Sequence, residues 1–184
     1  MQLDPRSSAL VLIDLQHGIV AGAKGPRSGE QVVETAKSLA DRFRAAGAPV
    51  ILVHVAFAPG NAPSRKVDNP TLPESSPPGF EALVDGLHHE GDIVVLKHHW
   101  GAFTGTDLDL HLRRRGVRTL VLAGIATNFG VESTARSAWE LSYDVVVVED
   151  ACTSRSAALH EFAVANILPQ IARLVSADAV RLDG

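Results

Sequence analysis

The sequence predicts an α/β fold, a three-layer α/β/α sandwich around a Rossmann-like parallel sheet of about six strands. Short runs of branched and apolar residues alternate along the chain with longer segments whose apolar residues recur at helical spacing. Several short runs are apolar throughout, which is typical of strands covered on both faces of a parallel sheet. Strands of that kind are joined by right-handed crossovers through the helices between them.

The overall composition is that of a folded globular protein. Of its 184 residues, 46% are hydrophobic and 21% are charged, so we expect residues 1–184 to form a single domain with a substantial core. The net charge of −4 argues against a basic surface for nucleic acid. One cysteine, Cys152, excludes an internal disulfide and fits a reducing compartment. Without a secretory leader or a membrane-spanning run, the expected location is the cytoplasm, with no membrane partner.

The first half of the chain is predicted to supply two neighbouring strands. Residues 8–14 are apolar up to Asp14, residues 31–46 have helical spacing, and residues 50–55 form the next apolar run. The proline-rich stretch 58–79 follows and shows little periodicity. Long loops in compact domains are usually functional or mobile, so we interpret it as part of an active-site rim. A plain surface excursion is an equally good interpretation.

The second half continues the alternation of strands and helices. The expected elements are a helix at 80–87, a strand at 92–96 ending at Lys97, a helix at 106–115, a strand at 119–123, a helix after residue 128, a strand at 145–148, a helix at 156–168, a strand at 172–175, and a terminal turn or helix at 177–182. In the 156–168 helix, we expect Ala158, Phe162 and Ala165 to face the core.

The segment 118–150 is predicted to be a strand, an abrupt turn, a helix and a strand. Gly124 permits the sharp turn, and Thr127 and Asn128 suit the start of the helix. Its predicted inward side chains are Val131, Ala135, Ala138, Trp139 and Leu141. A helix that starts beside the carboxyl end of a strand offers N–H groups and a partial positive charge. Such a turn suits an oxyanion or a carboxylate.

Two charged residues lie where predicted strands end. Asp14 closes the first strand and Lys97 closes another, and open α/β sheets bind ligands at that edge. Each residue alone has a plain alternative, because Asp14 could cap a turn and Lys97 could be solvated. Together with the 124–130 turn they indicate one converging site.

Three motifs carry a resemblance to a known family. They are G-I-A-T-N-x-x-V-E-x-T-A-R-x-A at 124–138, V-L-I-D-L-Q at 11–16, and the segment that begins with Leu96-Lys97 and continues through 103–108. In this order the chain resembles the isochorismatase-like hydrolases, also called the cysteine hydrolase superfamily. The resemblance implies an enzyme, a hydrolase that commonly assembles as a homodimer or homotetramer. It also implies an oxyanion site at the turn and a cis peptide bond between Ile125 and Ala126.

Gly130 is the main departure from the family pattern. It stands where most members have the nucleophilic cysteine, so covalent thiol catalysis is not expected. The resemblance implies another chemistry, because isochorismatases also have glycine there and hydrolyse a vinyl ether. In that chemistry the residue matching Asp14 is the general acid, and Lys97 pairs with the substrate carboxylate or tunes Asp14. We assign substrate contacts to Gln16, Trp100, Phe103 and Asn128, although a core role for Phe103 is equally consistent.

Two other functions remain open at this point. One is hydrolysis of a small amide C–N bond by water without a covalent intermediate, with Asp14 as a base. The other is a catalytically inactive protein that binds a small molecule in the retained pocket. Cys152 does not replace the missing nucleophile, because a buried structural thiol is the better interpretation of its position after a strand.

No metal site or cofactor is predicted. Some amidases of the superfamily hold a metal through an Asp-x-His motif after the second strand, and residues 53–58 lack it. The pairs His88-His89 and His98-His99 are adjacent, so their side chains diverge and do not favour one ion. Glu132 and Arg136 are four residues apart and are expected to form an ion pair on a helix.

Overall fold

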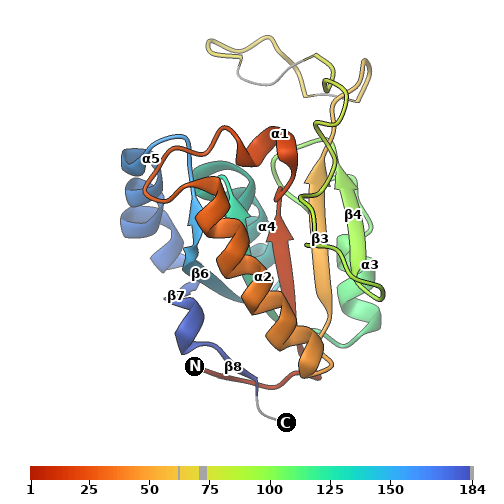
Figure 1. The fold of residues 1–184 in the computed structure, drawn as a ribbon, viewed down its shortest axis with the longest axis vertical. Coiled ribbons are helices and arrows are strands. Elements are labelled where there is room, and N and C mark those ends of the chain that lie inside the picture. Colours follow the sequence, from red (N-terminus) through yellow and green to blue (C-terminus); the bar gives the residue numbers. More distant parts are fainter. Residues whose placement is uncertain (62, 71–73, 183–184) are drawn as a thin grey trace.

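The computed structural model describes residues 1–61, 63–70 and 74–182. Its main feature is a six-stranded parallel sheet with the strand order β4-β3-β2-β5-β6-β7. The strands are β2 (Ser8–Ile13), β3 (Val50–Val55), β4 (Ile93–Lys97), β5 (Thr119–Ile125), β6 (Asp144–Thr153) and β7 (Arg173–Val175). The predicted α/β fold with a parallel sheet of six strands is confirmed (Figure 1).

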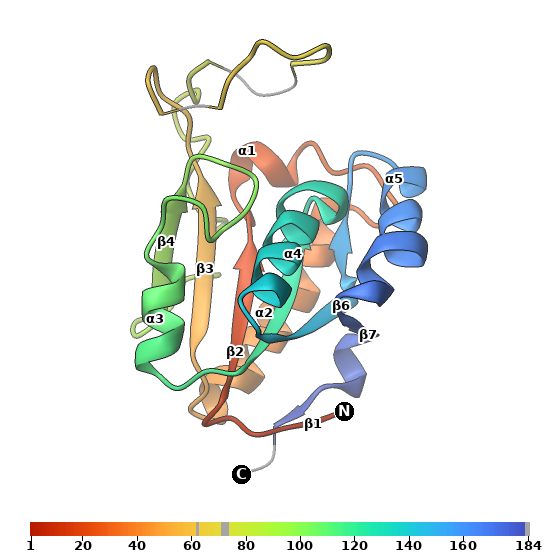
Figure 2. The same ribbon diagram turned by 180° about the vertical axis from the view of Figure 1, so that it is seen from behind.

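Helices cover both faces of this sheet. They are α1 (His17–Val20), α2 (Gly29–Ala45), α3 (Leu108–Arg114), α4 (Glu132–Glu140) and α5 (Ala157–Phe162). Shorter turns of π-helix (Thr127–Val131 and Ala163–Ile167) and 3₁₀-helix (Leu168–Gln170 and Ala177–Ala179) complete the set. Figures 1 and 2 show α2 on one face of the sheet and α3 and α4 on the other, which gives the three predicted layers.

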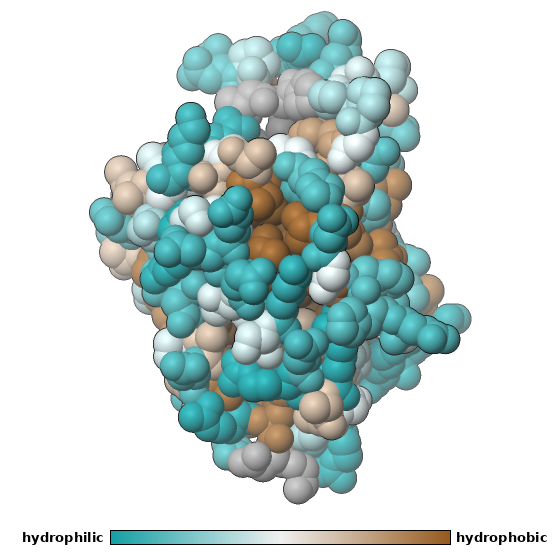
Figure 3. All heavy atoms as spheres, viewed as in Figure 1, coloured by the Kyte–Doolittle hydropathy of each residue, from teal (hydrophilic) through white to brown (hydrophobic). Residues whose placement is uncertain are grey.

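The sheet is buried as its sequence predicts. All six residues of β2 are buried, because this central strand has helices on both faces and a strand on either side. In the space-filling view of Figure 3, polar side chains cover most of the face that carries α2, and apolar side chains are visible mainly in a hollow near its centre. The apolar core therefore lies between the sheet and its helices.

The two ends of the chain meet in a second sheet that was not predicted. Strand β1 (Gln2–Leu3) pairs in parallel with β8 (Arg181–Leu182), where the sequence suggested a terminal turn or helix. Arg42 of α2 holds this closure by donating hydrogen bonds to the carbonyls of Val180 (3.0 Å) and Ala177 (2.9 Å). Figure 1 shows both termini at the pole opposite α1.

The loop after β3 holds no helix or strand in its described residues, as predicted. It extends beyond the carboxyl ends of β3 and β4, away from the rest of the molecule (Figures 1 and 2). Residues 62 and 71–73 of the loop lie outside the described residues. The helix predicted at 80–87 is wrong. Turns occupy this segment because its carbonyls at Phe80 and Ala82 accept hydrogen bonds from the backbone of α1 instead of from their own helix.

The predicted inward faces of two helices need correction. Ala158, Phe162 and Ala165 are exposed, Phe162 to 60%, whereas His160, Ala163 and Leu168 are the buried residues of that segment. The π-turn at 163–167 interrupts the regular spacing on which the prediction relied. On α4, Val131, Ala135 and Ala138 are buried as expected. The side chains of Trp139 (54% exposed) and Leu141 (39%) instead point outward.

Two further boundaries differ from the prediction. Neither Thr127 nor Asn128 caps α4, because the chain enters that helix through a π-turn whose cap residue, Ala126, makes no side-chain hydrogen bond. Strand β6 does not stop at residue 148 but continues to Thr153, with a register shift opposite residues 122–124 of β5. This longer strand brings residues 149–153 to the carboxyl edge of the sheet.

Candidate functional site

A cavity of about 190 Å³ lies at the carboxyl ends of β2, β4 and β5. Three charged side chains line it, from Asp14, Lys97 and Arg155. Most of the remaining wall is apolar, and it includes four aromatic rings, those of Phe57, Phe80, Trp100 and Phe129. A cavity this small and apolar, with few polar groups, suits a ligand of metabolite size.

Asp14 directly follows β2 and adopts an unusual backbone conformation. Its φ of +53° lies in the left-handed region, which is uncommon for a residue with a side chain and concentrates at functional sites. The neighbouring strand approaches closely here, since a Cβ on Gly124 would lie 2.1 Å from the carbonyl oxygen of Ile13. Only glycine permits that approach, so Gly124 helps to place Asp14 at the cavity wall.

Burial and Lys97 act in opposite directions on the acidity of Asp14. Removal from water raises the pKa of the Asp14 carboxyl above its usual range, and the Lys97 ammonium only partly offsets this. Lys97 Nζ lies 2.8 Å from Asp14 Oδ2 and also donates to the carbonyl of His99 (3.0 Å). Asp14 Oδ1 is buried and has no hydrogen-bond partner among the described residues. An unpartnered oxygen in apolar surroundings favours the protonated acid over the carboxylate.

The turn after β5 brings a third wall to the cavity. Ile125, Ala126 and Gly130 line it, and the peptide bond between Ile125 and Ala126 is cis, the isomer that the resemblance implies. A Cβ on Gly130 would lie 2.8 Å from Ile13 Cγ2 and 3.2 Å from Asp14 Oδ2. Residue 130 therefore lies directly beside the buried acid.

Three residues that we assigned to substrate contact lie outside the cavity lining. The Gln16 amide is buried and donates to the carbonyls of Val55 and Phe80, while its oxygen accepts from the Val55 N–H. Asn128 accepts a hydrogen bond from Ser154, and Phe103 packs against Tyr143 with ring centroids 5.9 Å apart. These contacts give the three residues roles in holding the chain around the site.

Trp100 does line the cavity, and Arg155 is a lining residue that the sequence analysis missed. The Trp100 ring lies 4.7 Å from that of Phe129, centroid to centroid, and is 43% exposed. Arg155 follows the end of β6 by two residues. The rule that singled out Asp14 and Lys97, a charged residue at the end of a parallel strand, would have found it had β6 been given its full length.

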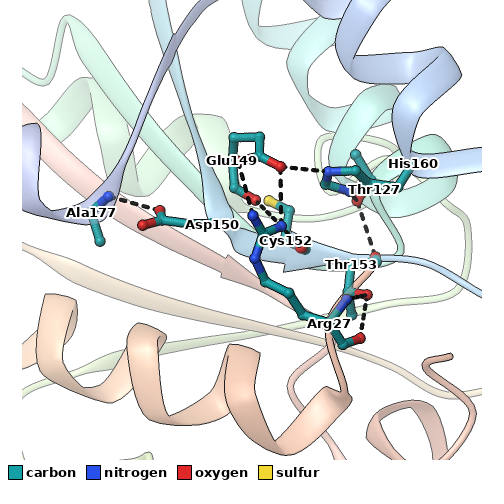
Figure 4. A network of polar contacts seen from close by, with 8 residues as sticks. All are labelled: Arg27, Thr127, Glu149, Asp150, Cys152, Thr153, His160 and Ala177. Atoms are coloured by element: carbon teal, nitrogen blue, oxygen red, sulfur yellow. Dashed lines mark hydrogen bonds and ion pairs between the residues drawn. The ribbon is translucent and has the colours of Figure 1, made fainter. Parts of the chain in front are cut away.

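A partly buried polar network joins the turn to neighbouring elements (Figure 4). Arg27 pairs with the Glu149 carboxylate through both terminal nitrogens (3.0 and 3.1 Å). His160 Nε2 lies 2.8 Å from Glu149 Oε1, and its Nδ1 lies 2.8 Å from the Thr127 hydroxyl. Thr127 in turn donates to the carbonyl of Thr153 (3.0 Å). The first residues of the turn are thus fixed to β6 and α5.

Other predictions from the sequence can be placed directly. Cys152 is fully buried outside the cavity lining, and burial raises the pKa of its thiol to about 12, as expected for a structural thiol. Glu132 and Arg136 form the predicted ion pair at 2.9 Å. The part of the chain that the structure describes contains no group of three or more potential metal ligands. It also contains no helix long and apolar enough to cross a membrane.

Comparison with known protein families identifies the family of this chain. The isochorismatase domain model matches residues 8–179. The chain belongs to the isochorismatase family. The uncharacterized isochorismatase family protein YecD of Escherichia coli O157:H7 is 46% identical over 183 residues, which are 98% of this chain and 97% of YecD.

Solved structures and other relatives agree with this membership. An isochorismatase family protein from Burkholderia thailandensis superposes with a TM-score of 0.92 at 47% identity, covering 97% of this chain and 95% of that one. The ureidoacrylate amidohydrolase RutB of Methylobacterium radiotolerans is 33% identical over 90% of this chain and 74% of its own length. Members of the isochorismatase family are hydrolases.

Proposed function

We propose that this isochorismatase family member hydrolyses a small carboxylated metabolite of the vinyl-ether type without a cysteine nucleophile. The observation that supports the proposal is the pairing of Asp14 and Lys97 in a cavity whose described lining contains no thiol. Gly130 takes the family's nucleophile position in this proposal. It has no side chain that could attack the substrate.

Asp14 is the general acid in the proposed reaction. Its proton passes to the terminal carbon of the enol ether, leaving an oxocarbenium ion and the Asp14 carboxylate. Water adds to the cationic carbon, the hemiketal then separates into an alcohol and a keto acid, and a proton returns to Asp14. The raised pKa of Asp14 supports this role, because a general acid must still hold its proton near neutral pH.

Lys97 supports the acid in two ways. Its ammonium group stabilises the Asp14 carboxylate that forms when the proton leaves, at a distance of 2.8 Å. Two of its three N–H groups have partners among the described residues, Asp14 and the His99 carbonyl, so the third is available to a substrate oxygen. The backbone of the 125–130 turn is the proposed oxyanion site.

The test is pyruvate release from isochorismate by the purified protein. We expect release by the wild type and loss of about two to four orders of magnitude in Asp14→Asn, which keeps the shape but lacks the proton. Equal release by both proteins would contradict the role of Asp14. Binding without release would instead favour the inactive, ligand-binding alternative.

Hydrolysis of a small amide is the second candidate. The 33% identity to ureidoacrylate amidohydrolases favours it. Asp14 would then act as a base that activates water, and ammonia release would identify the reaction. An ammonia screen across small amides separates this candidate from vinyl-ether hydrolysis.

The remaining proposals concern the location, cofactors, partners and oligomeric state of the enzyme. We propose a single-domain enzyme of the cytoplasm, without cofactor or nucleic-acid partner, that forms a homodimer or homotetramer as the family resemblance implies. Light scattering on the purified chain gives the subunit number directly. A monomer across micromolar concentrations would contradict the proposed assembly.

A further inference from the structure

Arg155 lines the cavity, and hydrogen bonds fix the backbone on either side of it. The preceding residue, Ser154, exchanges backbone hydrogen bonds with Gly25, donating at 2.9 Å and accepting at 3.2 Å. The following residue, Ser156, is the N-cap of α5, and its side chain accepts from the Leu159 N–H. The position of residue 155 is therefore set by the fold, even though its side chain is exposed.

The guanidinium of Arg155 has no acidic partner within the described part of the chain. Its one recorded contact is with the ring of Phe129, whose centroid lies 5.7 Å from Cζ. Other arginines, such as Arg27, Arg44 and Arg136, each contact a carboxylate. An unpaired arginine on an open surface needs no explanation, but this one lines a cavity with aromatic walls.

The charges of the side chains that line the cavity favour the binding of an anionic ligand by the Arg155 guanidinium. Asp14 lies 2.8 Å from Lys97, and no other acidic side chain lines the cavity among the described residues. With two basic side chains against one acid, the lining carries a net positive charge whether Asp14 is ionised or protonated. A guanidinium beside apolar walls suits a carboxylate, because its planar fork matches the two oxygens.

We propose that Arg155 is the anion-binding residue of the cavity and holds a carboxylate of a small ligand. The ligand's apolar body then lies between the rings of Trp100, Phe129 and Phe80, and its reacting end reaches Asp14 and Lys97. This inference takes the cavity as the ligand site of the proposed function, but it does not depend on the acid chemistry of Asp14.

The test compares two ligands of one shape and different charge. Benzoate and nitrobenzene are both planar and carry two oxygens, and neither has a bond that a hydrolase of this kind cleaves. Dissociation constants are measured by NMR titration of the full chain at pH 7, for the wild type, Arg155→Gln, Arg155→Lys and the control Arg114→Gln. Arg114 is exposed on α3 and does not line the cavity.

In the wild type and in Arg114→Gln we expect benzoate to bind more tightly than nitrobenzene. Arg155→Gln weakens benzoate binding by roughly 10- to 100-fold, the usual value of a charge-assisted hydrogen bond, and leaves nitrobenzene binding unchanged. Arg155→Lys keeps the positive charge without the planar guanidinium, so its benzoate affinity is expected to lie between those of the wild type and Arg155→Gln. Within the described residues, the polar and ring contacts of the Arg155 side chain amount to the one with Phe129, so its substitution is expected to leave the thermal midpoint unchanged.

Three results would overturn the inference. The first is that the wild type binds benzoate and nitrobenzene with equal affinity. The second is that Arg155→Gln binds benzoate as tightly as the wild type does. The third is that Arg155→Gln loses affinity for both ligands equally. Benzoate binding that fell in Lys97→Met but not in Arg155→Gln would assign the anion to Lys97 instead. Failure of isochorismate hydrolysis with an intact benzoate preference would contradict the proposed function and leave Arg155 as the anion site.

Discussion

Asp14 combines three features that bear on its chemistry: a left-handed backbone, burial and one unpartnered oxygen. Each feature costs folding free energy, and none is needed to end a strand. Their coincidence on one residue at a cavity wall supports a role in proton transfer. Lys97 is fully compatible with this role because it stabilises the deprotonated form that the reaction creates.

The first prediction concerns the sign of the pH dependence. The active form of a general acid is protonated, so kcat/KM is highest below the raised pKa of Asp14 and falls as the pH rises through it. A general base gives the opposite slope. Rate measurements from pH 4 to 9 with any substrate that is found therefore distinguish vinyl-ether hydrolysis from amide hydrolysis. A kcat/KM that rises with pH at the acid end of this range, with the rise absent in Asp14→Asn, would contradict the role of Asp14 as an acid.

The second prediction concerns Gly130→Cys, with Gly130→Ala as its control. Both add a Cβ that meets Ile13 Cγ2 at 2.8 Å, so both lower the free energy of unfolding in urea by about 1–3 kcal/mol. Only the cysteine adds a thiol, and it lines the same cavity as Lys97, whose ammonium favours a thiolate. We expect iodoacetamide to label native Gly130→Cys but neither the wild type nor Gly130→Ala, because Cys152 is buried with a pKa of about 12. Labelling of the native wild type would contradict this assignment.

At the scale of elements, the polar network of Figure 4 joins the 125–131 turn to β6, α5 and the segment before α2. Glu149 is its centre, since it contacts both Arg27 and His160. Burial alone would raise the pKa of Glu149, but the hydrogen bonds from Arg27 and His160 outweigh it and lower the pKa. The carboxylate form is therefore the one that stabilises the fold.

The third prediction follows from that lowered pKa. The stabilisation that the Glu149 carboxylate gives the fold is fully present above the usual glutamate pKa of about 4.3. It is lost as the pH falls through the lower pKa of the folded state. Glu149→Gln is expected to reduce the free energy of unfolding at pH 7 by about 2 kcal/mol. The difference from the wild type shrinks toward pH 3. Glu161→Gln, at an exposed position on α5, is the control. A difference independent of pH would show that the Glu149 charge is not responsible.

At the scale of the whole molecule, the cavity and the chain termini lie at opposite ends of the sheet. The cavity is at the carboxyl ends of the strands, and Figure 1 shows the termini at the other pole. The closure of the termini depends on Arg42, which bonds to two carbonyls of the last segment. Stability and ligand binding are therefore expected to respond to different substitutions.

The fourth prediction tests that separation. Arg42→Gln removes both hydrogen bonds to the C-terminal segment and is expected to lower the free energy of unfolding by about 1–3 kcal/mol. Benzoate affinity stays within twofold of the wild type, because the Arg42 side chain bonds to Val180 and Ala177, which do not line the cavity. Arg114→Gln changes neither quantity. A large loss of benzoate affinity in Arg42→Gln would mean that the two ends of the molecule are coupled.

Much of the fold was predictable because buried parallel strands have continuous apolar sequences. β2, β3 and β5 were found in this way. The inward face of α5 was not predictable, because its apolar residues point outward and its buried contact is made by His160. The partners of His160 are 11 and 33 residues away, so no local pattern reveals them.

The site was predictable only where strand ends converge. Asp14 and Lys97 each follow an apolar run and meet at the same edge of the sheet. Gln16, Phe103 and Asn128 lie near the motifs too, but their side chains are engaged by Val55, Tyr143 and Ser154, which are distant in sequence. Contacts of that kind depend on the folded chain and leave no trace in a single sequence.

The pairing of β1 with β8 also bears on the order in which the protein is synthesised. Residues 2–3 are synthesised well before residues 181–182, their partner among the described strands. The walls of the cavity likewise draw on positions from Asp14 to Arg155. A nascent chain that stops before Arg155 therefore lacks part of the cavity wall and leaves β6 without its neighbour β7, and such unpaired strand edges favour aggregation.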